Sequence, residues 1–494
     1  MLTRRKFNQI GLATIGSTIL PNASFGSDDA DIIVIGAGLS GLYSAMLLSQ
    51  LGLNVRVLEA GSEVGGRVKT LNTRNGPLDV GASQIGLGYA RVRSACRTLG
   101  LRLIPEDRDL LSFAMHAKGE WIEAKNWKNN PLNQCRGDER DILPMMMGRA
   151  VVDAYNPLSN LDDWLNPDFG RWDISLREFM LARGYSDQAI EFARWTTPGI
   201  SLDDTSMLRM FQESTRGRYD RSFMPQRKHG DAKHPFGEEN VVNEDGSIAT
   251  ISNIEGGCQR LPEAMARELP GRIDFGKKVR KIAMTKRGAT IECNDGSRYR
   301  SRYVISAIPF TMLREVEINA SNSPKTQKII QEMPYANTAR MYLDIEQPFW
   351  EEDGLSPSFS SDGPMGMFWA IDNHGRGPKH RAMIVLVGEA GRAITSKSNP
   401  EAFLLGELER LRPAAKGLVS MVAYKDWAAD PLQKGCGFSM APGQVSTLGR
   451  AIIEPWQVMH FAGEHTRRLD FGMESAMESG ERVAREIAGR AGLI

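Results

Sequence analysis

The first regular pattern of hydrophobic and polar residues consists of a short apolar run, a glycine-containing turn and a segment with helical periodicity. Ile32–Ile35 is continuously apolar, which is typical of a buried parallel strand. Leu39–Leu51 has the spacing of a helix, and Val55–Leu58 is a second apolar run. Together these segments predict a β-α-β unit.

The pattern then changes twice. Residues 91–223 carry mainly helical spacing and predict an inserted helical region, whereas residues 225–247 are polar and predict a long loop or lid. Strand-like alternation returns in residues 272–309, with a hairpin expected at the turn Asn294–Gly296. Further strands are expected within 338–350, 364–372 and 381–391, and the segment 459–492 predicts a strand, a loop and a helix from Met473.

The N-terminal segment differs from the rest of the chain. Arg4 and Arg5 precede Phe7, a modestly apolar run from Ile10 to Leu20 and small residues near Ala23. This order is typical of a twin-arginine export signal, so residues 1–28 are expected to be a signal peptide and the protein to be periplasmic or secreted. The alternative is a frayed basic tail. No later run of about twenty apolar residues is present, so no membrane span is predicted.

Composition and charge narrow the function classes. The 61 Lys and Arg residues nearly balance the 60 Asp and Glu residues in a chain of 494, so nothing indicates a nucleic-acid partner. The five cysteines form no CxxC pair, and neither a disulfide framework nor a metal site is predicted.

A glycine motif lies between the first predicted strand and helix. Gly36 permits the tight turn, Gly38 lets the backbone approach a pyrophosphate, and Gly41 lets helix and strand pack closely. Glu59, at the tip of the second predicted strand, is placed to accept hydrogen bonds from a ribose diol. A carboxylate there disfavours a 2′-phosphate, so an adenine dinucleotide of the NAD or FAD type is expected.

Several motifs along the chain resemble the flavin-containing amine oxidase family, which includes monoamine, polyamine and L-amino acid oxidases. They are GAGLSG, Glu59 followed by GGR, LDVGASQIG (78–86), GGCQRL (256–261), VISAIP (304–309) and FAGEHT (461–466). The resemblance covers residues 29–489. It implies FAD, bound without a covalent bond or, alternatively, through a thioether to Cys436.

The resemblance implies an α/β fold class with a Rossmann-like FAD-binding domain and a second, mixed sheet-plus-helix substrate-binding domain. We expect residues 29–90, 245–315 and 420–494 to form the first domain. Residues 91–244 and 316–419 are expected to form the second, including the helical insertion.

The resemblance also implies which residues contact the cofactor. The Met473 amide is expected to face the flavin, Glu464 the pyrophosphate and ribityl chain, and the Val279 backbone the adenine. The full expected set is Gly36, Gly38, Leu39, Ser40, Gly41, Glu59, Ala60, Gly66, Arg67, Gly81, Ala82, Ser83, Val279, Trp427, Gly463, Glu464 and Met473.

The chain departs from the family pattern on the substrate side. Arg340 stands where most members have a lysine near the flavin, and Gln84 stands where some L-amino acid oxidases bind the substrate carboxylate through an arginine. Both are candidate catalytic residues. Gly437 and Gly472 stand at the two positions of the aromatic cage of monoamine oxidases, with Trp369, Phe438 and Phe471 as candidate replacements.

We therefore expect an FAD oxidase that converts an amine to an imine, with release of a carbonyl compound, ammonia and hydrogen peroxide. An L-amino acid is the leading substrate, with a monoamine, polyamine or alkaloid amine as the alternative, and oxygen is the second substrate. Two rivals remain: a desaturase-like enzyme, and a flavin-binding protein without activity. A homodimer is a further expectation.

Overall fold

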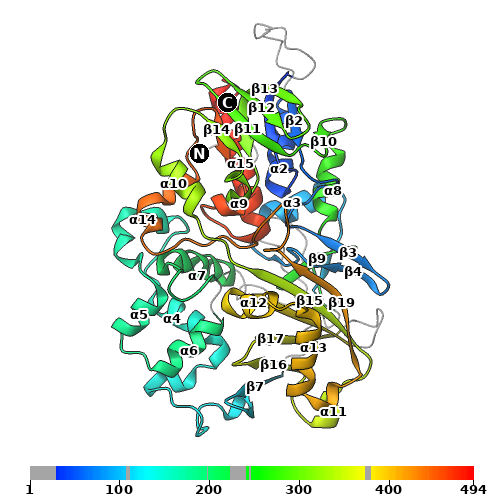
Figure 1. Cartoon of the computed structure of the whole chain (residues 1–494), viewed down its shortest axis with the longest axis vertical. Helices are drawn as coiled ribbons and strands as arrows, with labels where there is room; N and C mark the ends of the chain where they lie inside the picture. The colour runs from blue at the N-terminus through cyan, green and yellow to red at the C-terminus, as the bar shows by residue number, and fades with distance from the viewer. Residues whose placement is uncertain (1–28, 107–111, 197–198, 223–240, 244–245, 373–379) are drawn as a thin grey trace.

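The computed structural model describes residues 29–106, 112–196, 199–222, 241–243, 246–372 and 380–494. Two large sheets organise these residues, one in each half of the molecule (Figure 1). The expected export signal and residues 225–240 of the expected polar loop lie outside the described residues.

The first sheet forms the upper half of the molecule in Figure 1 and contains the predicted β-α-β unit. Its central strand β1 pairs in parallel with β2 on one side and β13 on the other. The strand order is β10 (Ile273–Asp274), β2 (Val55–Leu58), β1 (Asp29–Ile35), β13 (Arg298–Ser306), β12 (Ala289–Cys293), β11 (Val279–Met284) and β14 (Glu317–Asn319), and β20 (Met459–Phe461) also pairs with β13.

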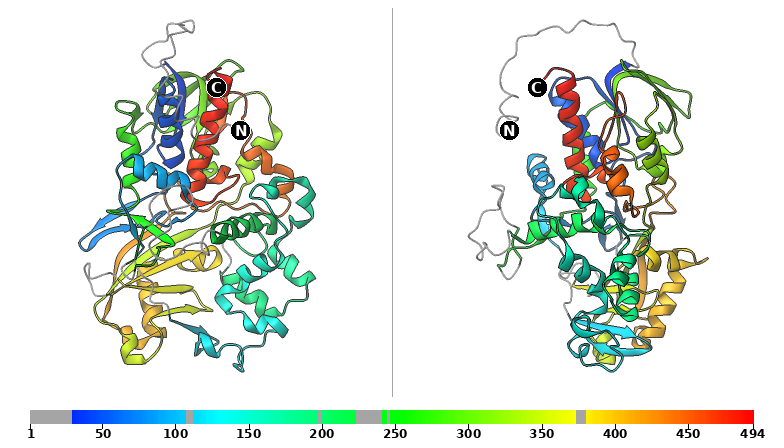
Figure 2. Two further views of the ribbon diagram at one scale, coloured as in Figure 1. Left: turned by 180° about the vertical axis from the view of Figure 1, so that it is seen from behind. Right: turned by 90° about the vertical axis from the view of Figure 1, so that its left-hand side faces the viewer.

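Local sequence signals explain this sheet well. The continuous apolar run of β1 is buried on both faces, as expected for a parallel strand covered by helices. The predicted hairpin is present, because β12 and β13 pair antiparallel across a turn in which Gly296 has a φ of +86°. Helices α2 (Leu39–Gln50) and α15 (Gly472–Arg490) pack side by side against the sheet (Figure 2).

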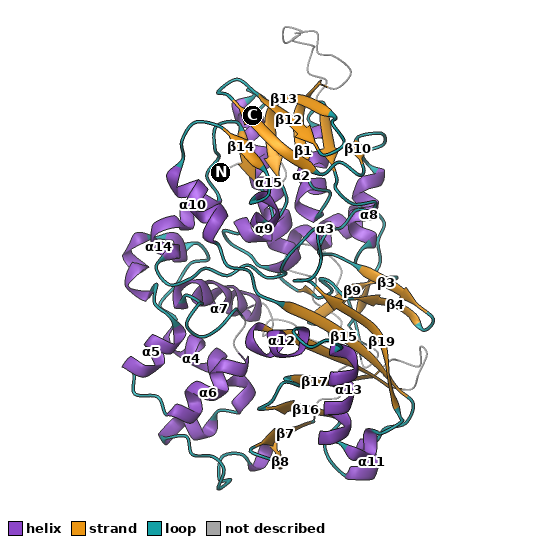
Figure 3. Cartoon of the chain, in the orientation of Figure 1, coloured by secondary structure: helices purple, strands orange, loops and turns teal. Residues whose placement is uncertain are grey.

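The second sheet forms the lower half and runs in the order β19 (Val419–Asp426), β15 (Thr338–Ile345), β18 (His380–Val387), β17 (Met367–Asp372), β16 (Ser358–Ser361), β7 (Phe113–Ala117) and β8 (Glu120–Glu123) (Figure 3). One face packs on α13 through residues such as Phe359, Phe368 and Leu404. The other face meets the helical insertion, since Met115 packs in the same core as α4, α6 and α7.

The helices cover both sheets and fill the space between them. Their bounds are α2 (Leu39–Gln50), α3 (Ala90–Thr98), α4 (Met147–Tyr155), α5 (Leu176–Ala182), α6 (Asp187–Thr196), α7 (Met207–Ser222), α8 (Arg260–Arg267), α9 (Phe310–Leu313), α10 (Pro324–Glu332), α11 (Trp350–Asp353), α12 (Gly388–Thr395), α13 (Pro400–Leu411), α14 (Gln444–Leu448) and α15 (Gly472–Arg490). In the described ranges, no helix combines the length and hydrophobicity that crossing a membrane requires.

Shorter elements connect the two halves. Two small sheets contain β3 (Thr70–Thr73) with β4 (Gly76–Asp79), and β5 (Ile85–Gly86) with β9 (Ile251–Ile254) and β6 (Leu103–Pro105). The 3₁₀ turns are η1 (Ala124–Asn126), η2 (Gly137–Asp141), η3 (Pro144–Met146), η4 (Asp163–Leu165), η5 (Pro167–Trp172), η6 (Pro413–Ala415), η7 (Gly449–Ile452) and η8 (Glu464–Thr466).

Sheet membership departs from the expected domain boundaries at two places. Strand β14, expected in the substrate-binding domain, pairs with β11 in the first sheet. Strand β19, almost all of which was expected in the FAD-binding domain, pairs with β15 in the second sheet. Pairing between strands distant in sequence decides both cases, and local periodicity carries no information about it.

Candidate active site

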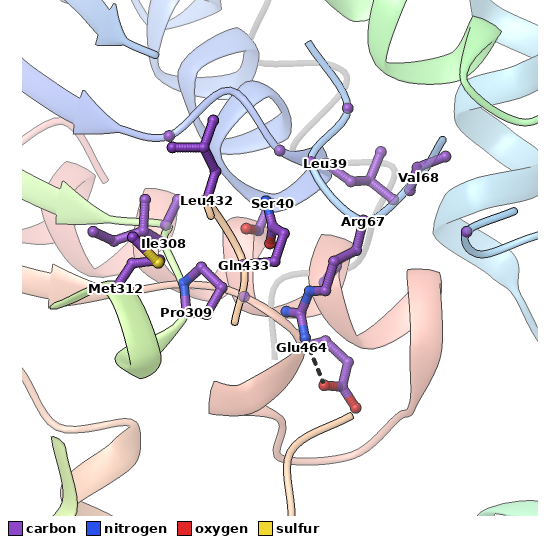
Figure 4. A pocket seen from close by; sticks show the side chains of 18 of the residues that line it. Leu39, Ser40, Arg67, Val68, Ile308, Pro309, Met312, Leu432, Gln433 and Glu464 are labelled. Atoms are coloured by element: carbon purple, nitrogen blue, oxygen red, sulfur yellow. Dashed lines mark ion pairs between the residues drawn. The ribbon is translucent and has the colours of Figure 1, made fainter. Parts of the chain in front are cut away.

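A cavity of about 310 Å³ lies where the two sheets meet (Figure 4). Its walls come from the loops after β1, β2 and β13, from β15, from the loop after β19 and from the start of α15. Most of the residues expected at the cofactor or substrate line it: Gly36, Gly38, Leu39, Ser40, Glu59, Ala60, Gly66, Arg67, Gly81, Ala82, Val279, Arg340, Trp427, Gly437, Gly463, Glu464, Gly472 and Met473.

The glycine motif has the three roles that its spacing predicts. Gly36 turns the chain with a φ of +101°, and a Cβ on Gly41 would lie 2.2 Å from the Gly36 carbonyl oxygen. A Cβ on Gly38 would have no neighbour within 4 Å. Gly38 therefore leaves free space at the N-terminus of α2, where backbone N–H groups favour a phosphate.

Glu59 is held as a ribose-binding carboxylate requires. One of its oxygens accepts a hydrogen bond from the Ala37 amide at 2.7 Å, and the other accepts one from the Gly61 amide at 2.7 Å. These bonds fix the carboxylate at the cavity wall while lone pairs remain for a diol.

A chain of charged side chains, buried at Arg467 and half-buried elsewhere, closes the far wall. Arg67 donates to the Cys436 carbonyl and lies 3.9 Å from Glu464, and Glu464 is ion-paired with Arg467 on its other side (Figure 4). Arg467 continues to Glu213 of α7 at 2.9 Å. The network therefore links the cavity wall to the helical insertion, and Arg67 adds positive charge to that wall.

The start of α15 opens onto the cavity. Gly472 has a φ of +60°, and a Cβ there would lie 2.8 Å from the Tyr89 hydroxyl. Any side chain at this position would meet both strain and a clash. Met473, the second residue of α15, therefore presents the positive end of a 19-residue helix to the cavity.

Arg340 is the cation on the substrate side. Its Nη1 donates to the carbonyls of Asp79 and Gly81 at 2.8 and 2.7 Å and to the Ser83 hydroxyl at 3.0 Å. All three acceptors are neutral, and in the described part of the chain Arg340 has no acidic ion-pair partner. Arg340 does have an acidic neighbour, since its charge partly offsets the rise in pKa that burial causes at the Asp79 carboxyl, but it makes no ion-pair contact there.

Cys436 and Gly437 lie beside this arginine. Burial raises the pKa of the Cys436 thiol, so the reactive thiolate is disfavoured. A Cβ on Gly437 would have no neighbour within 4 Å, so the cavity is open at this position. Trp427 flanks them, with its indole N–H fixed to the Val80 carbonyl at 3.0 Å.

Six residues expected at the cofactor or substrate lie away from the cavity wall: Gly41, Ser83, Gln84, Trp369, Phe438 and Phe471. Gln84 is directed to the surface and donates to both Glu106 oxygens at 3.0 Å, which corrects its assignment as a catalytic residue. Ser83 does not line the cavity, and its hydroxyl accepts a hydrogen bond from Arg340. Trp369 packs edge-on against Phe113, and Gly41 is buried in helix packing as expected.

The other two candidate replacement aromatics, Phe438 and Phe471, also pack away from the cavity. Phe438 is 1% exposed, and the guanidinium of Arg467 lies 4.4 Å from its ring centroid. Phe471 precedes α15 and packs edge-on against Tyr89 at 6.0 Å. Neither lines the cavity, so the open space at Gly437 is not filled by either ring.

Some lining residues were not expected from the sequence. Ile308, Pro309 and Met312 follow β13, and Leu432 and Gln433 follow β19 (Figure 4). The VISAIP motif contained a usable signal, because its last residues come from a strand that pairs with β1 and must meet the glycine turn. Leu432 and Gln433 lie in a loop without such a signal.

Comparison with known proteins agrees with this geometry. The family model for flavin containing amine oxidoreductase matches residues 39–488. The chain belongs to this family. Within the family, it is 24% identical to probable flavin-containing monoamine oxidase A of Dictyostelium discoideum, over 92% of this chain and 97% of that protein.

Two further relatives bear on fold and substrate. The chain is 23% identical to an L-amino-acid oxidase of Crotalus adamanteus, over 93% of this chain and 87% of that protein. The structure of cyclohexylamine oxidase from Brevibacterium oxydans superposes with a TM-score of 0.75 at 20% identity, covering 94% and 100% of the two chains. The α/β fold and the flavin amine oxidase activity are thereby confirmed, and FAD is the cofactor.

The cavity residues fit FAD. Gly38 leaves room for a pyrophosphate, Glu59 presents a fixed carboxylate for the ribose, and Met473 and Arg67 supply positive potential. When bound, FAD supplies the acceptor for the electrons removed from the carbon that carries the amine. The chain contributes binding, orientation and exclusion of water around that carbon.

Proposed function

We propose that the protein is an L-amino acid oxidase, which converts an L-amino acid, oxygen and water to a 2-oxo acid, ammonia and hydrogen peroxide. The observation that carries the proposal is Arg340. It lines the cavity, and among the described residues its hydrogen-bond acceptors are neutral and no carboxylate forms an ion pair with it.

A guanidinium that lies at a cavity wall without an ion-pair contact attracts an anionic group. The hydrogen bonds of Arg340 to Asp79, Gly81 and Ser83 all use Nη1, so Nη2 and Nε remain available as donors. Two nitrogens of the fork match the two oxygens of a carboxylate, and the Nη1 bonds hold the fork in place. Arg340 therefore takes over, in this proposal, the carboxylate-binding role considered for Gln84.

The open space at Gly437 supports the same substrate class. The α-carbon of an amino acid carries a carboxylate and a side chain, whereas the reacting carbon of a simple primary amine carries only one substituent. The branched carbon needs more room, and Gly437 leaves free space beside Arg340 and Cys436 on the cavity wall.

The alternative is an oxidase of amines without a carboxylate. The names of the relatives favour it, since they include a monoamine oxidase and a cyclohexylamine oxidase. In that case Arg340 serves only to hold the loop that contains Asp79, Gly81 and Ser83.

Matched substrate pairs distinguish an L-amino acid oxidase from an oxidase of amines without a carboxylate. The purified holoenzyme is assayed for peroxide and ammonia with L-amino acids and the amines that they give on decarboxylation, such as phenylalanine with phenethylamine and lysine with pentane diamine. The proposal expects turnover of the amino acid in at least one pair and a preference for it over its amine. Turnover of amines alone, with no L-amino acid oxidised, would refute it.

We also propose export by the twin-arginine route, supported by the Arg4–Arg5 pair and the weakly apolar run that follows. Replacing both arginines with lysine is expected to keep the precursor in the cytoplasm of a host with this export pathway. Cell fractionation checks this, and unchanged export of the variant would contradict it.

A further inference from the structure

A second cavity, of about 80 Å³, lies between the second sheet and the helical insertion. Its floor comes from β7, β16, β17 and β18, and its roof includes Pro144 and Met145 of η3 and Phe192 of α6. The lining is mostly apolar. A cavity of this size holds the end of a side chain and is too small for a whole cofactor or substrate.

Strand register connects this cavity to Arg340. Arg340 on β15 is directly opposite Val385 on β18. The β17–β18 register, continued by one residue from Phe368 and Ile384, places Met367 opposite Val385. Residues directly opposite in neighbouring strands share one face of a sheet.

The same row continues to the far strand. Ser360 on β16 is opposite Met367 on one side and Met115 on β7 on the other. Every member of the row beyond Arg340 lines the second cavity, from Val385 to Met115. With strands about 4.8 Å apart, the row extends about 19 Å from the β15 backbone.

Burial confirms which face this is. Ala339 and Leu386, one residue away from Arg340 and Val385, are completely buried in the core beneath α13. Arg340 and Val385 therefore point to the opposite face, toward the helical insertion. Arg340 and the second cavity lie on one continuous sheet face, formed in order by β15, β18, β17, β16 and β7, all but β18 of which are labelled in Figure 3.

The far end of the second cavity is polar. Asp362 follows β16, and its Oδ2 accepts the Lys118 amide at 2.7 Å. Its Oδ1 lies 3.7 Å from His116 Nδ1, a buried ring nitrogen without a hydrogen-bond partner in the described residues. Among those residues no Lys or Arg forms an ion pair with Asp362, although Arg410, whose pKa is raised mainly by its hydrogen bond to Glu407, is near enough for the Asp362 charge to raise that pKa slightly. A carboxylate with a free oxygen at the end of an apolar cavity is complementary to a cation or another hydrogen-bond donor.

We propose that this sheet face binds an elongated substrate side chain, apolar along its length and ending in an ammonium group held by Asp362. The inference rests on the proposed function, in which Arg340 holds the carboxylate at the other end. The substrate class is thus a long, basic L-amino acid, with Met367 and Val385 beneath its aliphatic part.

A chain-length series with the holoenzyme tests this. The apolar set is alanine, norvaline and norleucine, and the ammonium-ended set is ornithine, lysine and homolysine. We expect kcat/KM to rise with length in both sets and most steeply in the second. Asp362→Asn is expected to lower kcat/KM about tenfold or more for the ammonium-ended set and to change norleucine less than about threefold, because it removes one charge-assisted bond.

Two further variants complete the test. Glu120→Gln removes an exposed carboxylate of the adjacent strand β8 outside the cavity, and it is expected to leave both sets unchanged. Met367→Trp fills the cavity and is expected to shift the optimum to shorter substrates. Flavin content and melting temperature establish that each variant is folded.

The outcomes separate this inference from the proposed function. Equal effects of Asp362→Asn on both sets, or a flat length profile in the wild type, would overturn the inference while leaving amino acid oxidation intact. Linear diamines of increasing length are run in parallel. Oxidation of long diamines that depends on Asp362, without oxidation of any amino acid, would refute the carboxylate role of Arg340 and keep the distal site.

Discussion

Replacing Arg340 with methionine tests the proposed carboxylate site. The change removes the cavity-facing positive charge and keeps much of the side-chain volume. Truncating one partner of a buried, hydrogen-bonded charge pair costs about 2–5 kcal/mol. Because Arg340 is only partly buried and faces the cavity, we use the lower part of this range, about 2–3 kcal/mol, which corresponds to about 30- to 150-fold in kcat/KM.

The assay compares the members of one matched pair. The loss is expected for the L-amino acid, whereas its decarboxylated amine should lose little or gain, since it has no group for Arg340 to hold. Ser83→Ala is the structural control, because it removes one acceptor of the Arg340 Nη1 bonds and leaves the charge in place. An equal loss for both members of the pair in Arg340→Met would show that the arginine only supports the loop, and would refute the reasoning.

Three further predictions concern the cofactor and stability. Gly41→Val is expected to yield no folded holoenzyme, since its Cβ would lie 2.2 Å from a backbone oxygen, whereas Gly38→Ala should fold but bind FAD more weakly. Circular dichroism reports folding and flavin content reports FAD binding. Normal flavin content in either variant would contradict the role assigned to that glycine. Burial, with a smaller contribution from the neighbouring Asp470, raises the pKa of the Glu474 carboxyl from 4.5 to about 7. The folded state therefore holds this proton more tightly than the unfolded state. The free energy of unfolding consequently falls as the pH rises from about 4.5 to 7. Relative to Glu474→Gln, the wild type should lose about 3 kcal/mol of unfolding free energy over that pH range, as measured by denaturant unfolding at several pH values. A difference in unfolding free energy between the two proteins that does not change with pH would contradict this prediction. Acid precipitation is expected to leave all the flavin in the supernatant, because burial keeps the Cys436 thiol protonated; flavin in the pellet would indicate the thioether.

The sequence predicts the cofactor half of the site better than the substrate half for a physical reason. Gly36, Gly38 and Glu59 lie within one β-α-β unit, so their spacing along the chain determines their positions in space. The hairpin at Gly296 is similarly local. Such features depend on turn geometry and hydrophobic periodicity, which the sequence displays directly.

The substrate half depends on contacts between distant segments. Gln84 is close in sequence to lining residues Gly81 and Ala82, yet its amide turns outward to Glu106. No local pattern reveals that choice. The contact between Gly472 and the Tyr89 hydroxyl likewise joins residues far apart in the chain, and it was not predictable from the sequence.

The register between strands of the second sheet was also not predictable from the sequence. The sequence predicts strands at β15, β17 and β18 but does not give their order. The row from Arg340 to Met115 exists only because five strands align in one register. A shift of one residue in any strand would turn its member of the row to the opposite face.

The most direct measurement of the central claim is anaerobic mixing of the purified wild-type protein with single substrates while the flavin absorbance is followed. We expect that at least one L-amino acid bleaches the flavin, and that it does so faster than its decarboxylated amine at the same concentration. Reduction by amines alone would contradict the substrate class, and a flavin that no amino acid or amine reduces would contradict the assignment as an amine oxidase.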